Sequence, residues 1–423
     1  MSAGPGYRPG PWPGEDGGPA RTQVPPAGAP GGLGTRDGAG LRVTSRLAPA
    51  ATMLVTRDPG ELYLLRHTIG DDTVSFVERI DPVSLEPVVT SVELPGGPTW
   101  PGSLAAHANG SLYVVFGRHA HRLGPDLAVL ASRTLPRHLP YNGFVILPDG
   151  TLVTKDFAGS RPGAPVAAGG RQRCQLVALE PEGLEVVASC DLPEPSIARL
   201  SADGDTVYVV GDTSLLRVGW DGTALHPDER FRARYRTMDG QGYGWDCVLA
   251  GGAAWFLDDG DGSEGYTGTL RGHGLATAPL HLVRVGLADG AVTLAEVCGL
   301  PGGLVANPPV IDVDRSVAVA YDSGNGVVQA FTIGTDGSLA PRWRREQDHG
   351  AHLVLFPDTG ELVTGDYDAD RTADQVVVLD VDAGEELARA DTGSPLQGVL
   401  FPAVGFDGDA YLVTFATVTR LAR

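Results

Sequence analysis

Two features of the sequence predict an all-β fold. The 423 residues include 59 glycines and 33 prolines, about 22% against roughly 12% on average, so long helices are not expected. From residue 41 onward, a unit of four short apolar strands separated by tight turns recurs along the chain. Four strands per unit, at a period of about 49 residues, are typical of a β-propeller, in which each four-stranded sheet is one blade of a ring.

Residues 1–40 precede the first unit. This segment is rich in Gly and Pro, a composition typical of a disordered tail. It lacks the basic stretch and following apolar stretch of a secretory signal peptide. The sequence therefore predicts a disordered tail over residues 1–40 and a single propeller domain over residues 41–423.

Charge and cysteine content exclude several classes of protein. The chain has 52 acidic and 32 basic residues, a net charge of −20, and no basic stripe, so neither nucleic acid nor a membrane surface is an expected partner. No apolar run is long enough to span a membrane. Four cysteines do not make a disulfide scaffold. We expect a cytoplasmic protein with reduced thiols.

Eight units follow one another along the chain. The clearest two, at residues 144–156 and 353–366, match almost residue for residue apart from one insertion in the turn. Leu-Pro pairs often separate one unit from the next. The sequence predicts eight blades, with seven as the alternative, and the units begin near Thr52, Gly102, Phe144, Ser196, Trp245, Asn307, Leu353 and Leu396.

The last unit, residues 396–423, has room for only three strands. Residues 44–49 (Thr-Ser-Arg-Leu-Ala-Pro) are similar to residues 131–136 (Ala-Ser-Arg-Thr-Leu-Pro), the expected fourth strand of the second unit. We therefore expect an N-terminal strand to complete the last blade. Such closure removes the open sheet edge that would otherwise invite aggregation.

The stretch from residue 376 to 387 (Val-Val-Val-Leu-Asp-Val-Asp-Ala-Gly-Glu-Glu-Leu) resembles the repeat of the quinoprotein-like propeller superfamily, which includes PQQ-like and WD40-like propellers. The tryptophan that such repeats usually place after the Gly is absent here. The resemblance implies the propeller fold, and it suggests quinone-dependent oxidoreduction as one activity to consider.

One face of the ring is the expected place for a functional site. In an antiparallel blade, the start of the first strand and the loop joining the second strand to the third lie on the same face. The longest loops follow Asp156, Asp259 and Asp366, and long loops on a rigid scaffold often carry function. Carboxylates close the second strands at Asp156, Asp212, Asp259, Asp322 and Asp366. Asx-turns are the structural alternative for these aspartates.

Three sets of candidate residues belong to this face. Two acidic loops offer oxygen ligands at alternate positions, as Ca²⁺ prefers, although neither completes an EF-hand and a solvated acidic loop is the alternative. The expected metal ligands are Asp258, Asp259, Asp261, Asp366, Asp368 and Asp370. The expected ligand-binding residues are Asn142, Tyr141, Trp245, Asn307, His349 and Gln397. The expected catalytic residues are His352, Asp246 and Lys155, the only lysine in the chain.

These residues predict a small-molecule-binding propeller with its site in the axial funnel. Whether the protein is an enzyme is left open. If it is, hydrolysis or elimination fits best, with His352 or Asp246 as the base and Lys155 stabilising negative charge. The alternatives are a non-catalytic protein-interaction scaffold and a quinone-dependent oxidoreductase. The cofactor is left open, with calcium as the candidate that the acidic loops suggest.

Overall fold

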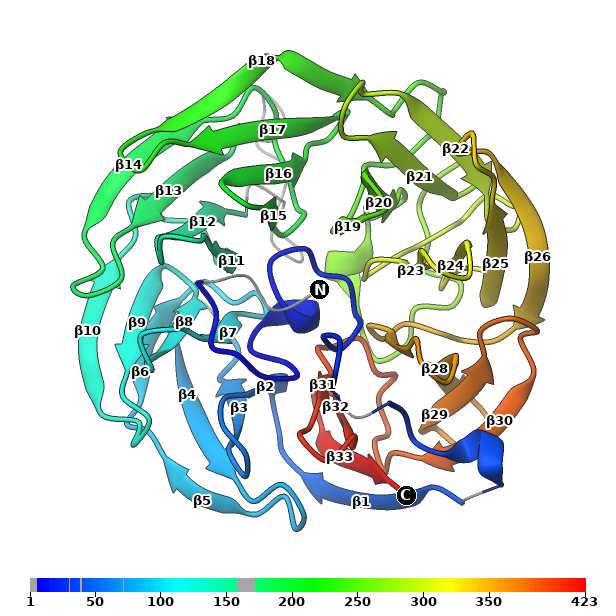
Figure 1. Ribbon diagram of the computed structural model, residues 1–423, viewed down its shortest axis with the longest axis horizontal. Helices are drawn as coiled ribbons and strands as arrows, with labels where there is room; N and C mark the ends of the chain where they lie inside the picture. The colour runs from blue at the N-terminus through cyan, green and yellow to red at the C-terminus, as the bar shows by residue number, and fades with distance from the viewer. Residues whose placement is uncertain (1–5, 30, 39, 71, 158–171) are drawn as a thin grey trace.

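The protein is an eight-bladed β-propeller (Figure 1). The computed structural model describes residues 6–29, 31–38, 40–70, 72–157 and 172–423. Its sheets are antiparallel, four-stranded in seven blades, and arranged around one central axis. The prediction of an all-β fold with eight blades is confirmed, and the seven-blade alternative is wrong.

The blades follow the chain in order, with the innermost strand first. Blade 1 comprises β2 (Ala51–Thr56), β3 (Leu62–His67), β4 (Thr73–Ile80) and β5 (Pro87–Thr90), with β6 (Leu94–Gly97) also pairing with β4; blade 2 comprises β7 (Ser103–Ala106), β8 (Leu112–Phe116), β9 (His119–Leu123) and β10 (Val129–Thr134); blade 3 comprises β11 (Tyr141–Ile146), β12 (Leu152–Asp156), β13 (Gln175–Leu179) and β14 (Val186–Asp191); blade 4 comprises β15 (Ser201–Asp203), β16 (Thr206–Val210), β17 (Ser214–Trp220) and β18 (Leu225–Arg234).

The second half of the ring repeats this order. Blade 5 comprises β19 (Val248–Ala250), β20 (Ala253–Leu257), β21 (His281–Gly286) and β22 (Val292–Glu296); blade 6 comprises β23 (Val310–Asp312), β24 (Val317–Asp322), β25 (Val327–Ile333) and β26 (Leu339–Glu346); blade 7 comprises β27 (Val354–Phe356), β28 (Glu361–Asp368), β29 (Ala373–Asp380) and β30 (Glu386–Asp391); blade 8 comprises β31 (Ala403–Val404), β32 (Ala410–Val413), β33 (Thr417–Ala422) and β1 (Arg42–Leu47).

Burial changes from the inner to the outer strands of each blade. Every residue of β2 and of β8 is buried, because both faces of these strands pack against neighbouring blades. The outermost strands β10 and β14 keep exposed residues at alternate positions. The continuous apolar runs in the sequence therefore correspond to the inner strands.

The N-terminal strand closes the ring. β1 pairs antiparallel with β33 from Arg42 opposite Ala422 to Leu47 opposite Thr417. Figure 1 shows β1 as the outer strand of the blade that carries the C-terminus. The predicted completion of the last blade from the other end of the chain is confirmed.

The segment that precedes β1 differs from the expected disordered tail. Residues 6–29, here called the N-terminal plug, lie at the centre of the ring (Figure 1). Tyr7, Trp12, Asp16 and Arg21 are all at most 4% exposed. Composition alone suggested disorder because Gly and Pro dominate the segment, but its aromatic and charged side chains are enclosed by the blades.

Backbone hydrogen bonds attach the plug to the inner strands. The carbonyl groups of Trp12, Pro13, Pro19, Ala20 and Gln23 accept N–H groups of Thr56, Ala106, Ala202, Leu249 and Leu355, which belong to blades 1, 2, 4, 5 and 7. Unpaired backbone donors in a protein interior are costly. The plug therefore satisfies inward-facing donors that the antiparallel ladders leave unpaired.

Regular helix is almost absent from the described residues. They contain three short 3₁₀ turns: η1 (Glu15–Gly17), η2 (Thr35–Asp37) and η3 (Ser263–Gly265). No helix in this part of the chain is long and apolar enough to cross a membrane. The four cysteines form no disulfide.

Candidate functional site

A cavity of about 560 Å³ opens on one face of the ring. Its lining comes from segments that precede first strands, from loops that join second strands to third strands, and from the last residue of β3. This is the face where the sequence predicted a site. The lining residues are His67, Ile69, Gly70, Thr99, Trp100, Pro101, Arg199, Trp245, Ser263, Tyr266, Thr267, Gly268, Leu270, Ala306, Asn307, Leu396, Val399, Leu400, Phe401 and Phe415. This volume is within the usual range of small-molecule pockets.

The walls of the cavity are mainly aromatic and aliphatic. Trp100 stacks on Phe157 with ring centroids 4.3 Å apart, and Trp245 lies 6.4 Å from Trp100. Tyr266 packs against Phe415 across the cavity wall, at 5.8 Å. Such walls favour the burial of an apolar, planar ligand.

The polar groups of the lining are few. The Nδ2 atom of Asn307 donates to the carbonyl oxygens of Gly350 and Val399, at 2.5 and 3.0 Å. The Nδ1 atom of His67 lies 2.7 Å from the carbonyl oxygen of Thr68, and burial lowers the pKa of His67. Its Nε2 atom has no hydrogen-bond partner among the described residues. These groups add no net charge to the lining.

Arg199 links the cavity to a buried charged cluster. Its guanidinium lies over the ring of Phe401, 4.3 Å from the ring centroid. Its Nη1 atom is 2.9 Å from Oε1 of Glu15, and its Nη2 atom donates to the carbonyl oxygen of Pro101 at 2.6 Å. Its backbone N–H donates to Oδ1 of Asp246 at 2.6 Å.

The plug supplies half of this cluster. Nη2 of Arg21 lies 2.6 Å from Asp16 Oδ2 and 2.7 Å from Asp246 Oδ2, and Nη1 of Arg21 pairs with Glu15. His352 Nδ1 lies 2.7 Å from Asp16 Oδ1. We define the charged cluster as Glu15, Asp16, Arg21, Arg199, Asp246 and His352. All six side chains are nearly inaccessible.

Ion pairing overcomes the cost of burial for part of the cluster. Burial alone would raise the pKa of Asp16, but His352 and Arg21 hold it below its usual value. For Arg199, burial lowers the pKa despite the opposing effects of Glu15 and Asp246. A buried charge whose partner is removed is strongly destabilising, so each member of the cluster depends on the others.

The three expected catalytic residues do not line the cavity. His352 and Asp246 are brought close together, as members of the charged cluster, and contact Asp16 and Arg21 of the plug. Lys155 lies apart from them, and its Nζ atom donates to the carbonyl oxygens of Asp156 and Ser196 at 3.3 and 3.1 Å. Their catalytic role stays a prediction, while their contacts give them a structural role.

Two of the six expected ligand-binding residues, Trp245 and Asn307, line the cavity. Gln397 does not line the cavity itself, but its Oε1 atom accepts the N–H of the lining residue Leu270 at 2.8 Å. Tyr141 is buried and its hydroxyl accepts the N–H of Arg137, away from the lining. The side chain of Asn142 lies outside the described part of the structure.

The expected calcium ligands lie in two separate loops, and four of the six accept hydrogen bonds from the protein itself. Among the described residues, no group of three or more His, Cys, Asp or Glu side chains is placed to hold a metal ion. Asp258 instead accepts hydrogen bonds from Gln241 and from the backbone of His281. Asp259 accepts the N–H of Gly242, and burial beside Asp258 raises its pKa to about 8. Asp261 lies in the same loop.

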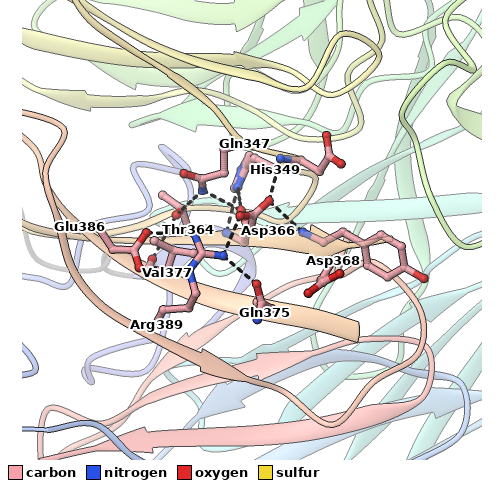
Figure 2. A network of polar contacts seen from close by, with 12 residues as sticks. Gln347, His349, Thr364, Asp366, Asp368, Gln375, Val377, Glu386 and Arg389 are labelled. Atoms are coloured by element: carbon pink, nitrogen blue, oxygen red, sulfur yellow. Dashed lines mark hydrogen bonds and ion pairs between the residues drawn. The ribbon is translucent and has the colours of Figure 1, made fainter. Parts of the chain in front are cut away.

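The second acidic loop shows the same use of carboxylates (Figure 2). Asp366 accepts N–H groups of Asp348 and Tyr367 and pairs with Arg389 at 2.7 Å. Asp368 accepts the N–H of Arg371, while Asp370 is exposed. The expected ligand residue His349 accepts the N–H of Gly365 through Nδ1, and burial lowers its pKa to about 4. These contacts stabilise blade 7, and calcium binding by this loop stays a prediction.

Several lining residues were missed by sequence reasoning. Trp100, Arg199 and Phe401 occupy the same place in the repeat, two or three residues before the first strand of a blade, as Trp245 does. Aligning the units on the starts of their first strands would have found them. Phe415 belongs to a short connection between a second and a third strand, and His67 ends the second strand β3 just before such a connection, so loop length did not point to either residue.

Comparison with solved structures shows the fold. BamB from Moraxella catarrhalis is 12% identical, with a TM-score of 0.50 over 89% of this chain and 100% of that one. Apo AztD from Citrobacter koseri is 13% identical, with a TM-score of 0.49 over 84% of this chain and 96% of that one. Virginiamycin B lyase from Staphylococcus aureus is 9% identical, with a TM-score of 0.46 over 90% of this chain and 99% of that one.

Comparison with protein-family models and with curated protein sequences finds no match. At identities this low, likeness to solved structures establishes fold and not activity. The resemblance to quinoprotein-like propellers therefore holds for the architecture, which is a β-propeller.

Proposed function

We propose that the protein binds a small, largely apolar molecule in the cavity. The observation that carries this proposal is the cavity itself, with about 560 Å³ of space, aromatic walls and few polar groups. Pockets that combine this size with apolar walls and a few fixed polar groups commonly bind small molecules.

The lining supports binding rather than catalysis by a carboxylate or a lysine. No Asp, Glu, Lys or Cys is among the described residues that line the cavity. An anionic quinone cofactor does not fit this lining, because its one cation, Arg199, is already paired with Glu15. The proposal is therefore a binding protein for an apolar ligand.

The protein-interaction scaffold is the second candidate. Val88, Leu130 and Val187 lie on the outer strands of blades 1, 2 and 3 and are 57%, 53% and 47% exposed. Contiguous apolar patches are a feature of interaction surfaces, so a partner that spans these three outer strands would bind through these side chains. Replacing all three with lysine should leave small-molecule binding unchanged and would abolish any contact made through these strands.

Filling the cavity tests the primary proposal. Ala306 lines the cavity, whereas Ala383 is an exposed residue in the turn after β29. We expect 2-naphthol, measured by isothermal titration calorimetry, to bind the unmodified protein and to bind A306W at least about tenfold more weakly, because the indole takes the ligand's space. A383W is the matched control and should bind as the unmodified protein does. Undetectable binding to the unmodified protein, or equal binding to A306W, would contradict the proposal.

A further inference from the structure

Arg199 is the one charged residue among the described residues that line the cavity. It is 4% exposed, and its guanidinium lies over the ring of Phe401, which also lines the cavity. An unpaired guanidinium at this place would attract carboxylate or sulfonate ligands, since charge-assisted hydrogen bonds are strong in a poorly hydrated site. Its partners therefore decide which ligands the cavity accepts.

Glu15 of the plug occupies the anion-binding side of Arg199. Its Oε1 atom is 2.9 Å from Nη1 of Arg199, and its Oε2 atom pairs with Arg21. Asp246 is farther from the guanidinium, with 3.9 Å between Nε of Arg199 and its Oδ2 atom. Glu15 is thus the carboxylate in direct contact with this guanidinium.

A second anion beside Arg199 would meet repulsion rather than attraction. The charged cluster already holds three carboxylates, Glu15, Asp16 and Asp246, against the guanidinium groups of Arg21 and Arg199 and the ring of His352. Water screens these groups weakly because all of them are buried. Like charges in such surroundings cost several times more than at the surface.

We propose that Glu15, from the N-terminal plug, sets the charge selectivity of the cavity by neutralising Arg199, so that the cavity selects uncharged ligands. This inference rests on the proposed function. It makes Glu15 a specificity-determining residue, although Glu15 itself does not line the cavity. It also identifies the ligand class as neutral molecules with an aromatic or aliphatic body.

Matched probes test the selectivity. The three probes 2-naphthol, 2-naphthoate and 1-naphthylmethylammonium share one ring system and differ in charge at neutral pH. For the unmodified protein we expect 2-naphthol to bind at least about tenfold more tightly than 2-naphthoate. In E15Q, which keeps the size of the side chain, we expect the ratio of the two dissociation constants to shift at least about tenfold toward 2-naphthoate.

Removing the cation instead gives the reciprocal test. R199M removes the lining residue that pairs with Glu15 and leaves the Glu15 charge next to the lining, so 1-naphthylmethylammonium should gain affinity relative to 2-naphthol, by about tenfold. The double variant E15Q/R199M should show neither the shift toward 2-naphthoate nor the shift toward 1-naphthylmethylammonium. D228N, at the half-exposed Arg217–Asp228 pair of blade 4, is the control for a remote charge change.

The outcomes separate the two proposals. If 2-naphthol binds but E15Q and R199M leave the charge preference unchanged, the inference about Glu15 is overturned and the binding function stands. If E15Q does not fold, the R199M result decides by itself. If none of the three probes binds the unmodified protein, the proposed function fails and the inference fails with it.

Discussion

Asp374 is a single buried carboxyl group that supports the cavity wall. Its Oδ1 atom accepts the N–H of Gly398 at 2.7 Å, and its Oδ2 atom accepts the hydroxyl of Thr392 at 2.7 Å. Gly398 lies between the lining residues Leu396 and Val399. Burial raises the pKa of Asp374 to about 7, with Asp366 nearby acting in the same direction.

The raised pKa of Asp374 predicts a pH-dependent stability. The pKa of Asp374 is about 7 in the folded protein, against an ordinary value of 3.8. The folded state therefore favours the protonated side chain, and this contribution to the free energy of unfolding is complete below about pH 4 and is lost as the pH rises through 7. D374N lacks this titration. We expect the free energy of unfolding of the unmodified protein to fall, relative to that of D374N, by roughly 3 kcal/mol between pH 5 and pH 9.

Urea denaturation of both proteins at the two pH values measures this difference. Asp259, whose pKa is also raised, is present in both proteins, so its effect cancels in the comparison. A stability difference between the two proteins that stays constant from pH 5 to pH 9 would contradict the assignment.

For single residues of the charged cluster, the sequence predicted their place in the ring better than it predicted the side chains that they contact. The sequence predicted that Asp246 and His352 lie near the axis, and both lie two residues before a first strand, in blades 5 and 7. Arg199, which sequence reasoning missed, has the same position before blade 4. Their partners Asp16 and Arg21 lie in a segment outside the repeat. No spacing rule connects that segment to the blades, and the cluster could not be predicted as a whole.

The N-terminal plug shows how a segment rich in Gly and Pro can form part of a core. Proline has no N–H group, so a proline-rich segment brings few donors that need partners when it is buried. Its carbonyls accept N–H groups from five blades. Asp16, Arg21 and Gln23 adopt left-handed backbone conformations, with φ of 49°, 54° and 58°. Such conformations are costly for these residues and persist where surrounding contacts fix them.

Trp12 tests whether the plug contributes to the core. It is fully buried and packs with side chains of blades 1, 7 and 8. Its backbone N–H donates to Oγ1 of Thr56 at 2.9 Å. We expect W12A to lower the free energy of unfolding by about 3–5 kcal/mol. R8A, in the same segment, removes only a half-exposed ion pair with Asp58 and should cost less than about 1 kcal/mol.

Guanidinium chloride denaturation monitored by circular dichroism compares the two variants. A W12A protein as stable as R8A would mean that residues 6–29 lie outside the core.

For the whole molecule, two parts of the N-terminal region have different roles in one ring. β1 completes blade 8 at the rim, and the plug fills the axis, so the N-terminal region contacts both the outermost and the innermost parts of the propeller. The sequence predicted the first role because residues 44–49 copy a strand of the repeat. It missed the second because composition averages over the few aromatic and charged residues that anchor the plug.

The plug also relates the fold to the proposed function. The cavity opens on one face, and Arg199 in its lining is paired with Glu15 of the plug. The plug fills the axis of the ring. Through the contact between Glu15 and Arg199, it also determines which ligand charge the cavity accepts. The central claim is therefore that residues 6–29 are an ordered part of the propeller core.

Hydrogen exchange of the full chain, followed by mass spectrometry, tests this claim most directly. The N–H groups of Trp12 and Gln23 are hydrogen-bonded inside the ring, so peptides covering residues 10–24 should exchange as slowly as those covering the inner strands β2 and β19. Exchange of these peptides within seconds, at the rate of an unfolded chain, would contradict it.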